Sequence, residues 1–151
     1  MALSVEEATS ATPEVVAAVQ RLVGQLSSSA QPPSAEQIAE ITSSPATVLL
    51  VARDGDGDGD GGLVVGMLTL ALFRIPTGVR AWIEDVVTDQ SARGRGVGMA
   101  LTEEAVRRAG AAGARTVDLT SRPSREAANR LYQRAGFRPR DTNVWRLDLE
   151  A

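Results

Sequence analysis

The chain has 151 residues and a formal net charge of −3, with 43% hydrophobic and 23% charged residues, so we expect residues 1–151 to form a single globular domain. The small acidic charge, with a sequence pI of about 5.0, argues against an extended phosphate-binding surface, and we expect no nucleic-acid partner. The chain has no Cys and no His, which excludes thiolate nucleophiles, disulfides, Cys/His zinc sites and a Ser-His-Asp triad.

The first part of the chain predicts two helices. Apolar residues recur at helical spacing through residues 13–26, with Thr12 as the expected N-cap and Pro13 at the first helical position. Ser34 and Gln37 have the spacing of a capping box, which predicts a second, shorter helix through Ile41. The pattern before Thr12 leaves open whether a strand comes first.

From residue 47 onward the apolar residues change from helical to strand spacing. Three strands are predicted, over Thr47–Ala52, Leu63–Phe73 and Val79–Thr88. The Asp/Gly-rich residues 54–62, between the first two strands, are expected to form a hairpin loop. They begin like a calcium-binding loop, but Val65 stands where such a loop needs Glu and the flanks predict strands, so we expect no metal site.

The last part of the chain alternates helices and strands. The expected elements are a helix over Gly96–Ala112, a strand over Arg115–Thr120, a helix over Ser124–Ala135 and a strand over Asn143–Leu149. Consecutive strands followed by a βαβαβ order predict an α/β fold with a mixed sheet. Its early strands should pair antiparallel, its later right-handed crossover should be parallel, and helices should cover its faces.

The segment Asp85–Leu101 carries the strongest chemical signal. A strand there runs into a loop of glycines and arginines, and the loop opens a helix. Glycines leave backbone N–H groups uncovered, and a helix N-terminus attracts anions through such groups and through its dipole. Because Arg93 and Arg95 lie in the same loop, the sequence predicts a pyrophosphate site here.

Three phosphate-binding motifs can be compared with this loop. A Walker loop needs a Lys that is absent here. A dinucleotide fingerprint starting at Gly94 needs Gly or Ala where Met99 stands, although Asp118 is suitably spaced to bind a ribose, so a small NAD-binding oxidoreductase domain stays an alternative. The third pattern, Arg93-x-x-Gly96-x-Gly98, resembles the (Gln/Arg)-x-x-Gly-x-(Gly/Ala) signature of the GCN5-related N-acetyltransferase (GNAT) superfamily.

The resemblance includes a second motif and the expected order of elements. The run from Ala128 through Leu131 and Tyr132 to Gly136 and Phe137 resembles the family's Ala-x-x-Leu-Tyr-x-x-x-Gly-Phe helix. Together the two motifs are far more specific than either alone. They imply a GNAT-like fold, in which antiparallel N-terminal strands and two splayed parallel central strands form one mixed sheet with helices on both faces.

The resemblance implies acetyl-CoA as the cofactor. Backbone groups of Val86 and Val87 would pair with the pantetheine arm, and the N–H groups of Arg95–Met99 would hold the pyrophosphate. Many members have Asn where this chain has Arg125, and Asn129, one turn on, is the candidate replacement. The full implied cofactor-binding set is Val86, Val87, Arg93, Gly94, Arg95, Gly96, Val97, Gly98, Met99, Asn129 and Tyr132.

Two side chains are candidates for proton transfer. By the resemblance Tyr132, the only Tyr in the chain, protonates the departing thiolate. Without His, the expected base is a carboxylate acting directly or through water, with Glu84 the first candidate and Asp85 the second. In a regular strand Glu84 shares a face with Val86. Asp85 then lies on the opposite face with Val87, so only one of the two carboxylates points at the acceptor.

These inferences predict an N-acetyltransferase that moves an acetyl group from acetyl-CoA to a primary amine. Because there is no Cys for an acyl-cysteine intermediate, we expect direct transfer in a ternary complex, with an N–H group of Val86–Val87 polarising the thioester carbonyl. The alternative is a non-catalytic acyl-CoA-binding sensor on the same scaffold. The acceptor, a small-molecule or peptide amine, stays open, as does the range of acyl groups.

The cellular location and the partners of the protein are predicted from two features that the sequence lacks and from the family resemblance. No apolar run approaches the ~20 residues that cross a bilayer, and the N-terminal residues include Glu6 and Glu7 in place of a basic region. We therefore expect a cytoplasmic protein with no membrane partner. The resemblance is also compatible with a homodimer.

Overall fold

The computed structural model describes residues 2–55 and 62–150, which form two compact units. The first unit ends at Thr120 and contains the sheet and three α-helices, whereas the second begins at Ser121 and contains helix α4 (Glu126–Arg134). The expectation of one domain over the whole chain stays a prediction. None of the helices among the described residues combines the length and apolar character needed to cross a bilayer.

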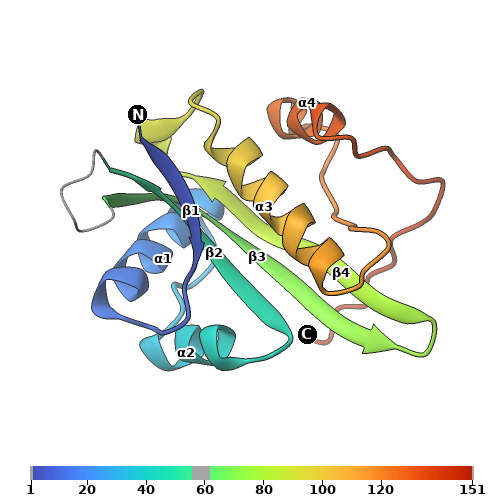
Figure 1. Ribbon diagram of the computed structural model, residues 1–151, viewed down its shortest axis with the longest axis horizontal. Helices are drawn as coiled ribbons and strands as arrows, with labels where there is room; N and C mark the ends of the chain where they lie inside the picture. Colours follow the sequence, from blue (N-terminus) through green and yellow to red (C-terminus); the bar gives the residue numbers. More distant parts are fainter. Residues whose placement is uncertain (1, 56–61, 151) are drawn as a thin grey trace. The chain divides into compact units, whose positions relative to one another are not determined.

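The first unit contains a four-stranded antiparallel sheet (Figure 1). In spatial order its strands are β1 (Leu3–Glu7), β2 (Thr47–Asp54), β3 (Leu63–Ile75) and β4 (Gly78–Thr88). The sequence left open whether a strand precedes Thr12. The structure has one there, β1, which pairs along β2 from Leu3↔Asp54 to Glu7↔Leu50. The three strands predicted from the alternating pattern are all present, each slightly longer than expected.

Helices α1 (Pro13–Leu26) and α2 (Ala35–Ser43) begin where their caps predict. The Thr12 hydroxyl accepts a hydrogen bond from the Val15 N–H at 3.2 Å. Ser34 and Gln37 form both reciprocal bonds of a capping box, at 3.2 and 2.9 Å. Such caps satisfy N–H groups that have no partner within the helix, which explains why both helix starts were predictable.

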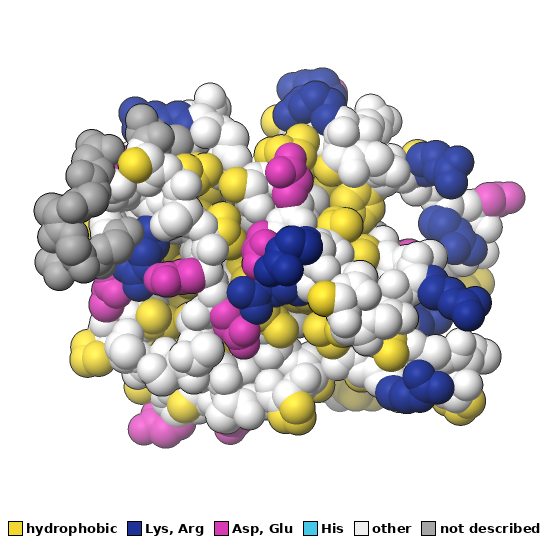
Figure 2. Space-filling view, viewed as in Figure 1, with side chains coloured by type: hydrophobic (Ala, Val, Ile, Leu, Met, Phe, Trp, Pro, Cys, Tyr) yellow, Lys and Arg dark blue, Asp and Glu magenta, His cyan; other side chains and the backbone are white. Residues whose placement is uncertain are grey.

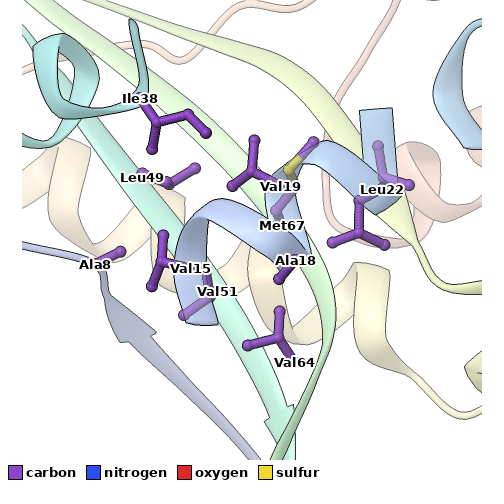
Figure 3. Close-up of a cluster of buried hydrophobic side chains, with 11 residues drawn as sticks. Ala8, Val15, Ala18, Val19, Leu22, Ile38, Leu49, Val51, Val64 and Met67 are labelled. Carbon is purple, nitrogen blue, oxygen red and sulfur yellow. The ribbon is translucent and has the colours of Figure 1, made fainter. Parts of the chain in front are cut away.

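A cluster of apolar side chains lies between these two helices and the sheet (Figure 3). Residues from α1, α2 and three strands point toward one another there. Leu22 and Ile38 have no exposed surface, and Leu49 and Val51 of β2 are almost completely buried. The full cluster is Ala8, Val15, Ala18, Val19, Leu22, Ile38, Leu49, Val51, Val64, Met67 and Val87.

Helix α3 (Val97–Ala111) covers the other face of the sheet (Figure 1). Successive strand residues face opposite sides, so Leu50 and Leu68, both without exposed surface, lie on the face away from Val51 and Met67. The buried stripe of α3 packs on that second face, and its members are Val97, Leu101, Thr102, Ala105 and Ala109. The structure therefore confirms the expected fold class, with helices on both faces of the sheet.

The predicted strand Arg115–Thr120 is reduced to a single parallel bridge between Trp82 and Asp118. Two backbone bonds form it, from Ile83 N–H to the Asp118 carbonyl at 2.9 Å and from Asp118 N–H to the Ala81 carbonyl at 3.0 Å. The parallel contact expected between the two central segments is thus present but confined to one point.

The predicted final strand Asn143–Leu149 is wrong, because the structure has no strand between residues 121 and 150. Trp145, Leu147 and Leu149 do alternate as expected, but they are 87%, 83% and 92% exposed. An alternating pattern fits a strand only where another strand supplies backbone partners and the apolar side chains are buried. Neither condition is met here among the described residues.

Candidate functional site

The candidate site begins at a β-bulge in β4. Thr69 pairs with Glu84 and Met67 pairs with Val87, so two residues of β4 stand opposite one residue of β3. Asp85, in the bulge, is the only described non-glycine residue with a positive φ, at 51°. Asp visits this left-handed region more readily than most residues, and a bulge leaves its extra residue outside the regular ladder.

The bulge changes which side chains share a face. Because cross-strand partners lie on the same side of a sheet, Glu84 shares a face with Val87 rather than with Val86. The expected pairing of Asp85 with Val87 on the opposite face is therefore wrong. The physical reason is the extra residue, which reverses the alternation beyond Glu84. Sequence spacing could not show this, since a bulge depends on the partner strand.

The bulge lies on the outermost strand of the sheet. Beyond the bridge at Trp82, no strand among the described residues pairs with the outer edge of β4. Backbone groups on this edge near Val86 and Val87 are thus in an extended conformation without a strand partner. An extended ligand with its own amide groups can pair with such an edge.

After β4 the chain forms a short 3₁₀ helix, η1 (Gln90–Ala92), and then the glycine-rich loop. Gly94 and Gly96 have φ angles of 79° and 83°, in the region that favours glycine. A Cβ added at either position would meet nothing within 4 Å, so both glycines line open space. Ala92 and Val97, each at least 98% buried, anchor the two ends of the loop.

The loop ends at an uncovered helix N-terminus. Gly96 is the N-cap of α3 and makes no side-chain capping bond. The first helical bond to it runs from Ala100 N–H to the Gly96 carbonyl, at 3.0 Å. No described group accepts from the N–H groups of Val97, Gly98 or Met99. Together with the exposed Arg93 and Arg95, these donors form an anion-binding cradle, which we define as residues 93–99.

The two candidate bases lie just before the cradle. Glu84 and Asp85 are both exposed, and neither side chain has a hydrogen bond or an ion pair within the described part of the chain. Asp89, which the motif comparison missed, is more constrained. Its carboxylate accepts bonds from Ser91 and Arg21, and the Ser91 N–H and the Arg21 charge hold its pKa below the usual value. Its partner Arg21 is 68 residues away in the sequence, so no local pattern reveals it.

Tyr132 belongs to the second unit, in the last turns of α4. Its ring meets the edge of Phe137, with centroids 5.8 Å apart and planes at 62°, and the residue is only 8% exposed. Burial raises the pKa of the Tyr132 phenol above its ordinary value, while the positive charge of Arg125 offsets part of this rise. The phenol is therefore protonated at neutral pH and able to donate.

Asn129 has a structural partner within the second unit. Its side-chain amide donates to the Arg122 carbonyl at 3.0 Å, which also accepts from the Arg125 N–H at 3.0 Å. The amide donors of Asn129 thus fix the turn that opens α4, and its oxygen has no partner among the described residues. Arginines are frequent in this unit, and Figure 2 shows several of these basic side chains exposed around the C-terminal segment.

The structure offers no metal site among the residues it describes, where no three Asp or Glu side chains cluster. Most of the Asp/Gly loop that begins like a calcium-binding loop, including Asp56, Asp58 and Gly59, lies outside the described residues.

Comparisons with known proteins agree with the two motifs. A sequence model of the acetyltransferase (GNAT) family matches residues 16–137. No curated protein matches the chain. Among solved structures, an acetyltransferase from Trypanosoma brucei is similar at 26% identity and a TM-score of 0.76, with 98% of this chain and 100% of that chain covered.

Two further solved structures show the same fold at lower identity. A transcriptional regulator from Bacillus halodurans has 24% identity and a TM-score of 0.79, covering 98% of this chain and 100% of that chain. An aminoglycoside acetyltransferase from an uncultured soil metagenomic sample has 21% identity and a TM-score of 0.75, covering 100% of this chain and 99% of the other.

Proposed function

The chain belongs to the acetyltransferase (GNAT) family, and we propose that it is an N-acetyltransferase that moves the acetyl group of acetyl-CoA directly onto a primary amine. The observation that carries the proposal is the cradle at residues 93–99, where free N–H groups of α3 follow two open, left-handed glycines. The second support is the bulged edge of β4, which leads directly into it.

The residues present fit CoA in two places. A pyrophosphate needs several donors and positive charge, which the N–H groups of Val97–Met99 supply together with Arg93 and Arg95. A pantetheine arm carries two amides, which the unpaired edge at Val86 and Val87 can bind as a neighbouring strand would. Asn129 is the candidate replacement for the Asn that many members have at the position of Arg125, and its side-chain oxygen, which has no partner among the described residues, is the group assigned to the cofactor.

Acetyl-CoA supplies an activated acetyl group as a thioester, and the chain's own residues supply proton transfer and polarisation. Glu84, with Asp85 as second candidate, takes the proton of the amine nitrogen directly or through water. A backbone N–H of the Val86–Val87 stretch donates to the thioester carbonyl oxygen. Tyr132, whose phenol is protonated at neutral pH, donates its proton to the leaving sulfur.

The acceptor class is a primary amine, from a small molecule or a peptide. The similar aminoglycoside acetyltransferase supports a small-molecule amine as the first class to test. Peptide lysines form the second class, and the chain itself simplifies that experiment. All 16 of its basic residues are Arg, so the enzyme has no lysine side chains of its own to become acetylated.

The test is release of free CoA from acetyl-CoA over a panel of aminoglycosides, polyamines and lysine peptides, with the acetylated product identified by mass spectrometry. The proposal predicts that at least one amine gives turnover well above the acceptor-free rate. Binding of CoA without turnover on any of these amines would instead favour the acyl-CoA sensor. Binding of NAD without CoA would favour the dinucleotide alternative.

A further inference from the structure

Helix α1 is hydrogen-bonded to the residues that lead into the cradle. Arg21 donates from Nε to the Asp89 carboxylate at 3.3 Å and from Nη2 to the Val64 carbonyl at 2.8 Å. Asp89 in turn caps η1, because its other oxygen accepts from the N–H and the hydroxyl of Ser91, both at 3.0 Å. One guanidinium therefore joins α1, β3 and the start of η1.

A second contact lies one helical turn further along α1. The side-chain oxygen of Gln25 accepts from the Gln90 N–H at 2.9 Å. Residues four apart lie on the same face of a helix, so Arg21 and Gln25 present adjacent groups to the same short segment. The first two residues after β4, Asp89 and Gln90, are thus both bonded to α1.

The same stretch of β3 contacts both the segment that precedes the cradle and the first residue of α3 within it. The Val65 carbonyl accepts from the Asp89 N–H at 2.8 Å. At Gly66, an added Cβ would come within 2.7 Å of Val97, the first residue of α3. Three successive residues of β3 thus make these contacts. Val64 is bonded to Arg21, Val65 is bonded to Asp89, and Gly66 lies against Val97 of α3. Only three residues separate Asp89 from Arg93, so we expect a shift at Asp89 to reach the loop.

We propose that Arg21 is a positioning residue for the cofactor: through Asp89 it holds the cradle in the conformation whose N–H groups bind the CoA pyrophosphate. The proposal rests on the proposed function, since it concerns the same cradle. A preformed site binds more tightly because less order is lost when the ligand arrives. Arg suits this task because its rigid fork reaches a carboxylate and a carbonyl together, which a single ammonium does less well.

The first experiment measures CoA binding by calorimetry for the wild type and for Arg21→Met, which keeps the apolar stem. We expect the dissociation constant to rise about three- to tenfold, the usual effect of losing one or two hydrogen bonds. Glu14→Gln is the matched control, because Glu14 is bonded to Arg53 at the other end of α1, with no contact to the cradle. It should leave CoA binding unchanged.

Two further measurements separate positioning from general loosening of the fold. Pantetheine, which lacks the pyrophosphate, should bind the wild type and Arg21→Met equally in an NMR titration. Asp89→Asn keeps the cap on Ser91 but removes the charge that Arg21 meets. If Arg21 acts through Asp89, the double variant should bind CoA no more weakly than Arg21→Met alone.

Each result decides the proposal. Weaker CoA binding with unchanged pantetheine binding and a non-additive double variant would support it. Equal CoA affinity in the wild type and Arg21→Met, equal losses for CoA and pantetheine, or additive effects would overturn it. A wild type that does not bind CoA at all would instead refute the proposed function, and is distinguished by the first titration.

Discussion

The two units of the chain differ in the balance of their charged residues and in how those residues are paired. Residues 1–120 hold nine arginines and fifteen acidic residues, and all the ion pairs of the described residues lie there. Residues 121–151 hold seven arginines and four acidic residues, and their described part has no ion pair. In the first unit Arg21, Arg53 and Arg108 link helices and strands to one another. In the second they are exposed around one short helix.

This difference suggests a division of tasks. The first unit contains the cradle and the structure that shapes it, so we expect it to determine cofactor affinity. The second unit contributes Tyr132, the proposed proton donor to the leaving sulfur, so we expect it to affect turnover more than affinity. Variants in the two units should therefore have different kinetic signatures.

The largest effect is expected from Gly96→Asp. The new carboxylate would stand among the donors of the cradle and repel the pyrophosphate, so CoA affinity should fall about a hundredfold or more in calorimetry. Gly113→Asp is the matched control, because Gly113 also has a positive φ, 92°, and open space around it, but lies just past the other end of α3. Each substitution places Asp in a left-handed conformation at a cost of about 1 kcal/mol, and the dipole of α3 makes Gly96→Asp the less destabilising of the two. Normal CoA binding by Gly96→Asp would refute the cradle.

Tyr132→Phe tests the second unit. Removing the phenolic proton donor should lower kcat about a hundredfold on whichever amine is accepted, while the dissociation constant for CoA stays close to that of the wild type. The readouts are steady-state kinetics and a parallel calorimetric titration. If turnover were unchanged, Tyr132 would have no part in proton transfer, and the proposed division between the units would fail.

Gly66→Ala tests the packing beneath the cradle. Its new Cβ would stand 2.7 Å from a Val97 methyl and 3.0 Å from the Val87 carbonyl oxygen, so the variant should lose about 2 kcal/mol in the free energy of unfolding. Gly24→Ala, in helix α1 with nothing within 4 Å, should gain about 1 kcal/mol. Urea unfolding measures both changes. If both substitutions changed the free energy of unfolding in the same direction, the close approach at Gly66 would be contradicted.

The smallest effect concerns acid stability of the first unit. Hydrogen bonds from Arg107 and Arg108 lower the pKa of Glu104 to about 2. A lowered pKa stabilises the fold above the unfolded value of 4.5, and this stabilisation is lost as pH falls from about 4.5 toward 2. Glu104→Gln should remove about 1 kcal/mol at neutral pH, since the group is partly exposed, and should flatten the stability curve over that range. Glu103→Gln, the same substitution at the neighbouring exposed position of α3, is the control.

Local signals made most of the first unit predictable. The caps at Thr12 and Ser34 and the switch to strand spacing at Thr47 each involve residues a few positions apart, and the structure confirms them. The glycine-rich loop and the helix after it were also where the pattern placed them. These features need no knowledge of distant partners, which is why spacing alone was sufficient.

The features that spacing missed all depend on distant partners. The bulge at Asp85 arises in the register between β3 and β4, and it changed the face assigned to Glu84. The bond between Arg21 and Asp89 joins residues that are far apart in sequence. Residues 143–149 are the opposite case. Their alternating pattern is typical of a strand, but no strand among the described residues pairs with them.

The measurement that tests the central claim most directly is a calorimetric titration of the full chain with acetyl-CoA, CoA and NAD in parallel. The cradle and the family membership predict that acetyl-CoA and CoA bind with similar affinity and that NAD does not bind. Binding of NAD alone, or of none of the three, would contradict the assignment of residues 93–99 as a CoA pyrophosphate site.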